Sequence, residues 1–178
     1  MFNHISDNGL HRVMNFEGFV ARPAPDPVGI MTVGHGHVVR KWEEKKYAGR
    51  TMSRDEAFAL LKDDMVNVRS ICLGRWVKVP VTQNQADALH SFVFNIGCMA
   101  FQRSTFLHKL NNLDYVGAAL EFHKWNKAGN PLHELPGLTT RRSIEESLFA
   151  QPEDAKLMLA HFEADEVYHK YAACAEGY

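Results

Sequence analysis

Two capping boxes constrain the fold of this chain more than any other feature of its sequence. In each box a Ser or Thr is followed three residues later by Glu or Gln, and the two side chains satisfy free amides in the first turn of a helix. The first box, Ser53 to Glu56, opens onto apolar residues at helical spacing as far as Ile71. The second, Thr82 to Gln85, opens onto a similar run that stops at Gly97. The sequence therefore predicts two long helices in the middle of the chain.

The remaining periodic segments predict more helices and little sheet. Ser6 and Asp7 can cap a helix that runs to Phe16, with Gly18 helping to end it, so that Glu17 lies at its C-terminal end. Only the stretch 30–39 is β-branched and punctuated by glycine, as a short hairpin is. Three prolines and a glycine over 22–29 predict tight turns without regular structure. Further helices are predicted over 105–110, 114–125, 138–149 and 153–173, with a loop over 131–137.

One small hairpin followed by many helices predicts an α+β fold that is mostly helical. We expect a single domain over 1–178. It comprises a small lobe over about 17–55, a connecting helix over about 53–73 and a helical lobe over about 76–173, on which the N-terminal helix packs. A cleft between two lobes is where a ligand is expected.

Composition excludes several classes of function. The chain has 178 residues, of which 46% are hydrophobic, with a net charge of −1, so it lacks the basic excess of nucleic-acid-binding proteins. No apolar run approaches the roughly 20 residues of a membrane span, and no secretory signal is visible, which predicts synthesis in the cytoplasm. The predicted C-terminal helix is acidic and a poor candidate for insertion into an anionic membrane.

Cysteines and histidines give no sign of a metal or cofactor. Cys72, Cys98 and Cys174 are odd in number and widely separated, which favours reduced, buried thiols. His35 and His37 could form a ligand pair, but no Cys, Asp or Glu completes a set at the usual spacing. We expect neither a metal nor a cofactor.

Glu17 and Asp26 are the residues with the clearest chemical potential. One acid ends a helical run and the other lies on a Pro/Gly-rich turn, an arrangement that can place two unequal carboxyls at one cleft. Glycoside hydrolysis needs that inequality, because one carboxyl must keep its proton near neutral pH while the other is ionised. Taken singly, each acid is more often a solvated or capping residue than a catalytic one.

The ordered set of Glu17-Gly18, Asp26, Thr32, Gly34, Gly36 and His37 resembles the phage-type lysozymes, glycoside hydrolase family 24. That family carries E-G, a turn with D, and then T-x-G-x-G-H, and the separations match without a gap. The resemblance continues through 82–97, Trp125 to Gly129, and 135–145, and so spans roughly residues 6–150. Ala24 departs from the family, which usually has an aromatic there, and prolines flank Asp26 on both sides.

The resemblance implies a lysozyme-like fold and roles for particular residues. Glu17 would be the general acid, Asp26 the ionised partner, and Thr32 would position water, with inversion at the anomeric carbon. A basic partner for Glu17 is expected, and either Arg141 or Arg142 could serve. Gly34, Gly36 and His37 would be structural. Four further positions could meet the sugar or simply cap helices: Asn95, Gly97, Ser104 and Thr105.

The implied function is a muramidase that hydrolyses the β-1,4 bond between N-acetylmuramic acid and N-acetylglucosamine in bacterial peptidoglycan. We expect a monomer that is made in the host cytoplasm, depends on a holin or another delivery system, and acts in the periplasm. Three alternatives stay open: a catalytically silent peptidoglycan-binding module, a secreted antibacterial effector with the same chemistry, and a lytic transglycosylase.

Overall fold

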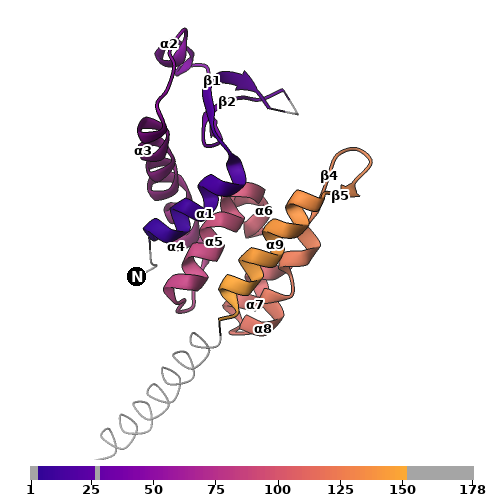
Figure 1. The fold of residues 1–178 in the computed structure, drawn as a ribbon. Coiled ribbons are helices and arrows are strands. Elements are labelled where there is room, and N and C mark those ends of the chain that lie inside the picture. Colours follow the sequence, from indigo (N-terminus) through magenta and orange to yellow (C-terminus); the bar gives the residue numbers. More distant parts are fainter. Residues whose placement is uncertain (1–3, 27–28, 152–178) are drawn as a thin grey trace, which may run out of the picture.

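The structure is a computed structural model that describes residues 4–26 and 29–151. It is mostly helical, with a three-stranded and a two-stranded antiparallel sheet, and this confirms the predicted α+β class (Figure 1). The larger sheet stands beside helix α3, while α5, α6, α7, α8 and α9 gather in a separate helical group. The predicted helix over 153–173 lies outside the described residues.

Helix α1 (Asp7–Glu17) begins and ends where its capping residues predict. The Ser6 side chain accepts a hydrogen bond from the Gly9 amide at 3.1 Å. Gly18 ends the helix with φ of 70°, a conformation that a residue without Cβ adopts at little cost, and its amide donates to the Met14 carbonyl. Glu17 is therefore the last residue of a rigid element.

The larger sheet has three strands, β1 (Val20–Pro25), β2 (Met31–Gly34) and β3 (His37–Val38), in that order. The hairpin predicted over 30–39 is confirmed as β2 and β3. The prediction that residues 22–29 lack regular structure is wrong over 22–25, because β1 pairs antiparallel with β2. Pro23 and Pro25 are tolerated because β1 is an edge strand, where one row of backbone groups makes no ladder bonds.

Both capping boxes are present, with reciprocal hydrogen bonds. The first opens α3 (Arg54–Asp64), which continues through a π-helical turn, η1 (Met65–Arg69), into α4 (Ser70–Trp76). The second opens α5 (Gln83–Ile96), which ends at Gly97 as predicted. Between the sheet and α3 lies a short helix that the sequence did not predict, α2 (Glu44–Tyr47).

The second half of the chain is more finely divided than predicted. The helices α6 (Cys98–Gln102) and α7 (Thr105–Asn111) follow α5. The helix predicted over 114–125 is split into α8 (Tyr115–Ala119) and a 3-10 turn, η2 (Phe122–Trp125). Strands β4 (Lys127–Ala128) and β5 (His133–Glu134) form a hairpin, so the loop prediction over 131–137 is wrong at β5. The last described helix is α9 (Pro136–Phe149).

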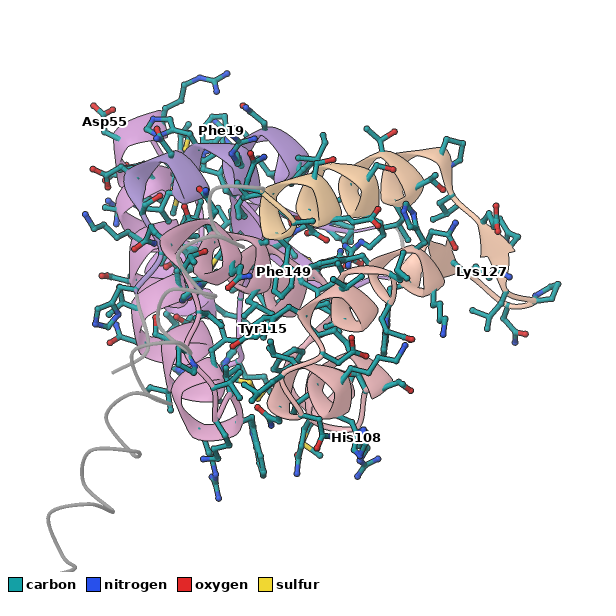
Figure 2. All side chains as sticks on the ribbon, turned by 90° about the horizontal axis from the view of Figure 1, so that it is seen from below. Phe19, Asp55, His108, Tyr115, Lys127 and Phe149 are labelled. Carbon is teal, nitrogen blue, oxygen red and sulfur yellow. A yellow bond between two sulfur atoms is a disulfide. The ribbon has the colours of Figure 1, made fainter. Side chains whose placement is uncertain are left out.

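Aromatic side chains form the centre of the helical group. Phe92 on α5 is fully buried and contacts Phe106 and Phe122, with ring centroids 5.2 and 4.9 Å away. Phe149 at the end of α9 closes this cluster against Phe106 and Phe122. Figure 2 shows Phe149 among the helices, whereas Lys127 lies on the outlying hairpin. The cluster fixes α9 against α5, and that packing determines which α9 side chains reach the site.

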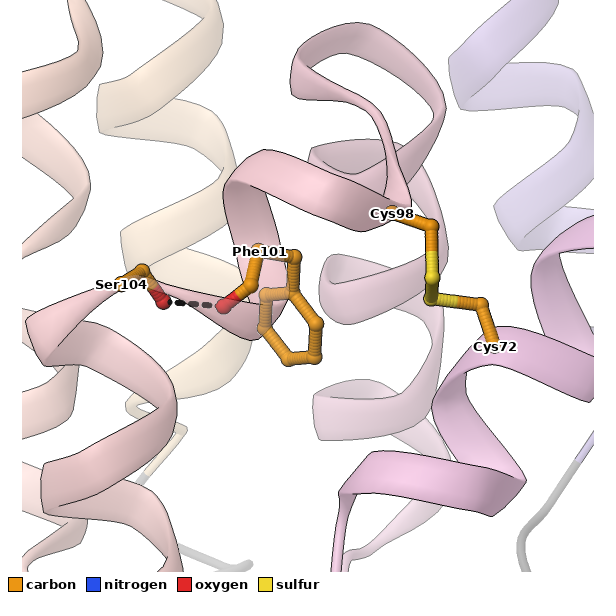
Figure 3. Close-up of a disulfide and its surroundings, with 4 residues drawn as sticks. All are labelled: Cys72, Cys98, Phe101 and Ser104. Atoms are coloured by element: carbon orange, nitrogen blue, oxygen red, sulfur yellow. Dashed lines mark hydrogen bonds between the residues drawn. A yellow bond between two sulfur atoms is a disulfide. The ribbon is translucent and has the colours of Figure 1, made fainter.

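Cys72 and Cys98 form a disulfide between α4 and the first residue of α6, with Cα atoms 6.0 Å apart (Figure 3). The prediction of reduced thiols is therefore wrong for these two residues. Separation along the sequence gave no sign of the pairing, because the turn at Gly97 is what brings Cys98 back beside α4. Cys174 lies outside the described residues.

Within residues 4–26 and 29–151, no helix combines the length and apolar character that a membrane crossing requires.

Candidate active site

Glu17 extends from the end of α1 to meet α9. Its side chain is 20% exposed, and its Oε1 accepts a hydrogen bond of 2.6 Å from Nη1 of Arg141. The Arg141 guanidinium also lies over the Phe16 ring, 4.9 Å from its centroid. A carboxyl that is partly buried yet still reachable suits an acid that must meet a substrate.

Arg141 is held by more than Glu17. Its Nε donates to Oε1 of Glu145 at 3.0 Å, and its Nη2 donates to the backbone carbonyl of Ser91 at 2.9 Å. The Ser91 hydroxyl donates to the same Glu145 oxygen at 2.5 Å. Because Arg141 is 4% exposed and Glu145 only 1%, these bonds lie in the interior. The guanidinium is therefore fixed on several sides before it meets Glu17.

Arg142 points to another part of the same network. Its Nη2 donates to Oδ1 of Asn95 at 2.7 Å, and its guanidinium lies over the Phe92 ring. Its Nε is 3.2 Å from Oε2 of Glu145, an ion pair without hydrogen-bond alignment. Burial lowers the pKa of Arg142 to about 10, so it remains charged at neutral pH, and burial raises the pKa of Glu145 against the opposing effect of the two guanidiniums. Of the two arginines that the sequence left open, the structure places Arg141 on Glu17.

Gly36 lets the β2–β3 turn approach the acid. Its φ is 81°, and a Cβ there would be 3.2 Å from Oε2 of Glu17 and 3.4 Å from Cε1 of Phe94. Gly34 has a similar conformation, with φ of 67°, and a Cβ there would meet Met52 and Ala57. Both glycines of the motif are therefore required by backbone conformation and by space.

Asp26 follows the edge strand β1 and holds the connection to β2. Its Oδ1 accepts from the Ile30 amide at 2.8 Å, and its own amide donates to the Ile30 carbonyl at 2.8 Å. The Gly29 amide closes the turn onto the Asp26 carbonyl at 2.9 Å. Asp26 is half-buried, and its carboxylate is oriented by backbone groups of its own hairpin.

Thr32 lies in the middle of the three-stranded sheet. It pairs with Ala24 on one side and Val38 on the other, and its hydroxyl donates to the Ala24 carbonyl at 3.4 Å. The side chain is half-buried. Asp26 and Thr32 are therefore carried by neighbouring strands of one small sheet.

His37 fastens this sheet to α3. Its Nδ1 is 2.8 Å from Oδ2 of Asp64, and its Nε2 is 3.3 Å from Oε1 of Glu43. The hydrogen bond with Asp64 raises the pKa of His37, and Glu43 adds to the effect. His35 is buried, and its Nδ1 donates to the Gly18 carbonyl. Across the residues that the structure describes, no three His, Cys, Asp or Glu side chains are grouped to hold a metal ion.

The four remaining predicted positions cluster around the end of α5. Asn95 binds Arg142, and Gly97 ends α5 with φ of 82°. Ser104 is buried and caps α7, accepting from the Leu107 amide at 3.0 Å and donating to the Phe101 carbonyl at 2.7 Å (Figure 3). Thr105, the first residue of α7, is exposed.

Ser91 and Glu145 belong to the site, although sequence reasoning did not assign them a role. The available signal was spacing, because Glu145 follows Arg141 by four residues and Arg142 by three, which places all three on one side of a helix. Ser91 gave no comparable signal, since its role depends on how α5 packs against α9.

Comparison with known proteins agrees with this geometry. Residues 14–145 match the family model described as phage lysozyme. The endolysin of Acyrthosiphon pisum secondary endosymbiont phage 1 is 41% identical over 148 residues, which cover 82% of this chain and 97% of the relative. Two solved structures are also similar. A P22 lysozyme variant has a TM-score of 0.73 and 36% identity, and the match covers 84% of this chain and 99% of that one. The muramidase domain of SpmX from Asticaccaulis excentricus has a TM-score of 0.74 and 34% identity, and the match covers 84% of this chain and 100% of that one.

The fold, with a partly exposed acid at the end of its first helix, defines a glycoside hydrolase of the lysozyme type. The chain belongs to the phage lysozyme family. Membership of that family makes it a muramidase that degrades bacterial peptidoglycan.

Proposed function

We propose that Glu17 is the general acid of this muramidase, protonating the glycosidic oxygen as the bond between N-acetylmuramic acid and N-acetylglucosamine breaks. The observation that carries this assignment is the contact of Glu17 with Arg141, which fixes a partly exposed carboxyl between α1, α9 and the Gly36 turn. An acid catalyst must be held in one geometry relative to the bond that it protonates.

Asp26 is proposed as the ionised partner, and Thr32 as the residue that positions the attacking water. Two features support these roles. Asp26 accepts a hydrogen bond from the Ile30 amide, which fixes the direction of its carboxyl group. Thr32 is on the adjacent strand, where a hydroxyl can share a water with that carboxylate. Inversion is the expected stereochemical outcome, and proton NMR of the first product anomer tests it.

The decisive experiment uses purified peptidoglycan and two readouts. Release of reducing ends measures the rate, and mass spectrometry of the muropeptides identifies the reaction. A hydrolase adds one water to each product, whereas a lytic transglycosylase leaves an anhydro sugar. We expect products that carry the added water, and a Glu17→Gln variant that folds but loses at least ~10² in rate. A Glu17→Gln variant with nearly full rate would remove Glu17 from this role, and anhydro products would assign the other reaction.

We also propose that the protein acts as a monomer in the periplasm after a holin or another delivery system has let it leave the cytoplasm. The Cys72–Cys98 disulfide supports an oxidising compartment as the place of action, since such bonds persist there and are reduced in the cytosol. Expression in Escherichia coli with and without a co-expressed holin tests delivery. Lysis that is equally fast without the holin would contradict this dependence. Light scattering after gel filtration measures the oligomeric state.

A further inference from the structure

The contact between Arg141 and Glu17 poses a chemical problem that the structure also answers. A guanidinium 2.6 Å from a carboxyl oxygen stabilises the ionised carboxylate. A general acid must instead hold a proton until its substrate takes it. An arginine with an unbalanced charge would therefore orient Glu17 but also favour loss of the proton that a general acid must donate.

Glu145 lies on the other side of the same guanidinium. It accepts from Arg141 Nε at 3.0 Å and from the Ser91 hydroxyl at 2.5 Å, both on Oε1, and its Oε2 is 3.2 Å from Nε of Arg142. Each of its two oxygens faces a guanidinium nitrogen, which favours the ionised form of the carboxyl against the opposing effect of burial. Because the group is 1% exposed, water screens its charge weakly.

Glu145 lowers the net positive charge of the groups around Glu17. With Glu17 protonated, Arg141, Arg142 and an ionised Glu145 sum to +1. Without the charge of Glu145 the sum becomes +2, and ionising Glu17 would relieve more repulsion. The glutamate therefore weakens the pull of the arginines on the proton of Glu17.

We propose that Glu145 is a positioning residue for Glu17, which balances the charge of Arg141 so that the arginine orients the acid without ionising it. This inference deepens the proposed function and rests on Glu17 being the general acid. Glu145 touches neither substrate nor reacting atoms and acts through Arg141.

Other titratable groups lie on the elements around Glu17. On the sheet side, the buried His35 ring donates to the Gly18 carbonyl, and His37 is bound to Asp64 of α3 and to Glu43. From α5, Ser91 and Asn95 meet the arginines without bringing charge. On α9, Arg141, Arg142 and Glu145 are the charged groups of the network.

The test is the pH dependence of hydrolysis of purified peptidoglycan at constant ionic strength. Activity falls at alkaline pH where the general acid loses its proton. In Glu145→Gln, Arg141 is no longer balanced, so we expect this alkaline limb to move to lower pH, by on the order of 1 pH unit. Glu145→Asp keeps the charge, and its limb should stay close to that of the unaltered protein.

Two further variants separate charge from packing. Ser91→Ala removes hydrogen bonds to Arg141 and Glu145 without changing charge, so it should lower the rate and leave the limb in place. Arg142→Gln removes one positive charge and should move the limb to higher pH. This variant also keeps the idea testable if Glu145→Gln does not fold.

The inference is overturned if the alkaline limb of a folded Glu145→Gln or Arg142→Gln protein coincides with that of the unaltered protein, or if Ser91→Ala moves it as far as Glu145→Gln does. Failure of the proposed function looks different, because Glu17→Gln would then retain its activity whatever the other variants do.

Discussion

The two carboxylates of the site are held by different kinds of partner. Glu17 is bound by Arg141, a side chain 124 residues further along the sequence, and Arg141 is fixed in turn by Ser91 of α5 and by Glu145 of its own helix. Asp26 is bound by the Ile30 amide, four residues away, within its own hairpin. One acid depends on the tertiary packing of the molecule and the other on a local turn. A change in the network around Arg141 should therefore lower the stability of the whole molecule, whereas removing the charge of the Asp26 side chain should affect activity alone.

Removing Glu145 gives the largest expected effect on stability. Glu145→Leu leaves two buried guanidiniums without their shared counter-charge, and we expect a loss of about 3–5 kcal/mol in the free energy of unfolding. Urea denaturation measures it. Glu134→Leu, on the exposed hairpin, is the matched control and should change stability by less than about 0.5 kcal/mol. Equal losses in the two variants would show that the network does not stabilise the helical side.

Asp26→Asn, unlike Glu145→Leu, should reduce activity with little change in stability. The amide oxygen can still accept from the Ile30 amide, so stability should change by less than about 1 kcal/mol. The rate should fall on the order of 10²-fold, because the substitution removes the negative charge of the proposed ionised partner. Unfolding and hydrolysis are measured on the same preparation. If Asp26→Asn is as active as the unaltered protein, Asp26 is not the ionised partner and another residue must have that role.

Much of this local geometry follows from the sequence. The caps at Ser53 and Thr82 gave the long helices, and Gly18 gave the end of α1, because the partners in each case are within a turn of one another. The β-branched, glycine-punctuated stretch over 30–39 predicted the hairpin, and the motif from Glu17 to His37 gave its tight glycines by resemblance to a family. Only the strand β1 was missed here, because prolines are compatible with an edge strand as well as with turns.

What the sequence could not supply depends on packing between distant elements. The choice between Arg141 and Arg142 is set by the rotation of α9 against α5, which the Phe92 cluster determines. Ser91 enters the site for the same reason. The Cys72–Cys98 pairing required the relative positions of α4 and α6, which spacing does not give.

Gly36→Ala tests the approach of the β2–β3 turn to Glu17, and its expected effect on stability is intermediate. The added methyl meets both an unfavourable φ and the Glu17 carboxyl, so we expect a loss of about 1–3 kcal/mol and reduced activity. Gly49→Ala is the control, since Gly49 has φ of 68° but open space around its Cβ position. It should lose about 1–2 kcal/mol for the conformation alone and keep its activity. If Gly49→Ala lowers activity equally, the approach to Glu17 is not what Gly36 provides.

The smallest expected effect is the pH dependence contributed by His37. Its pKa is raised in the folded protein, so the protonated ring stabilises the fold fully below its unfolded-state value of about 6.5. That contribution is lost as the pH rises through the folded-state pKa. The stability difference between the unaltered protein and His37→Gln should therefore shrink from pH 6 upward. A stability difference that stays constant with pH would mean that the charge of His37 does not contribute to the stability of the folded protein.

The distance along the chain between Glu17 and Arg141 has a consequence for biosynthesis. Glu17 is synthesised first, and Arg141, which orients its carboxyl, is added 124 residues later. A polypeptide cut short before α9 therefore contains the whole Glu17-to-His37 motif and still lacks the arginine that orients Glu17. The contact that orients Glu17 can form only once α9 has been made and has docked.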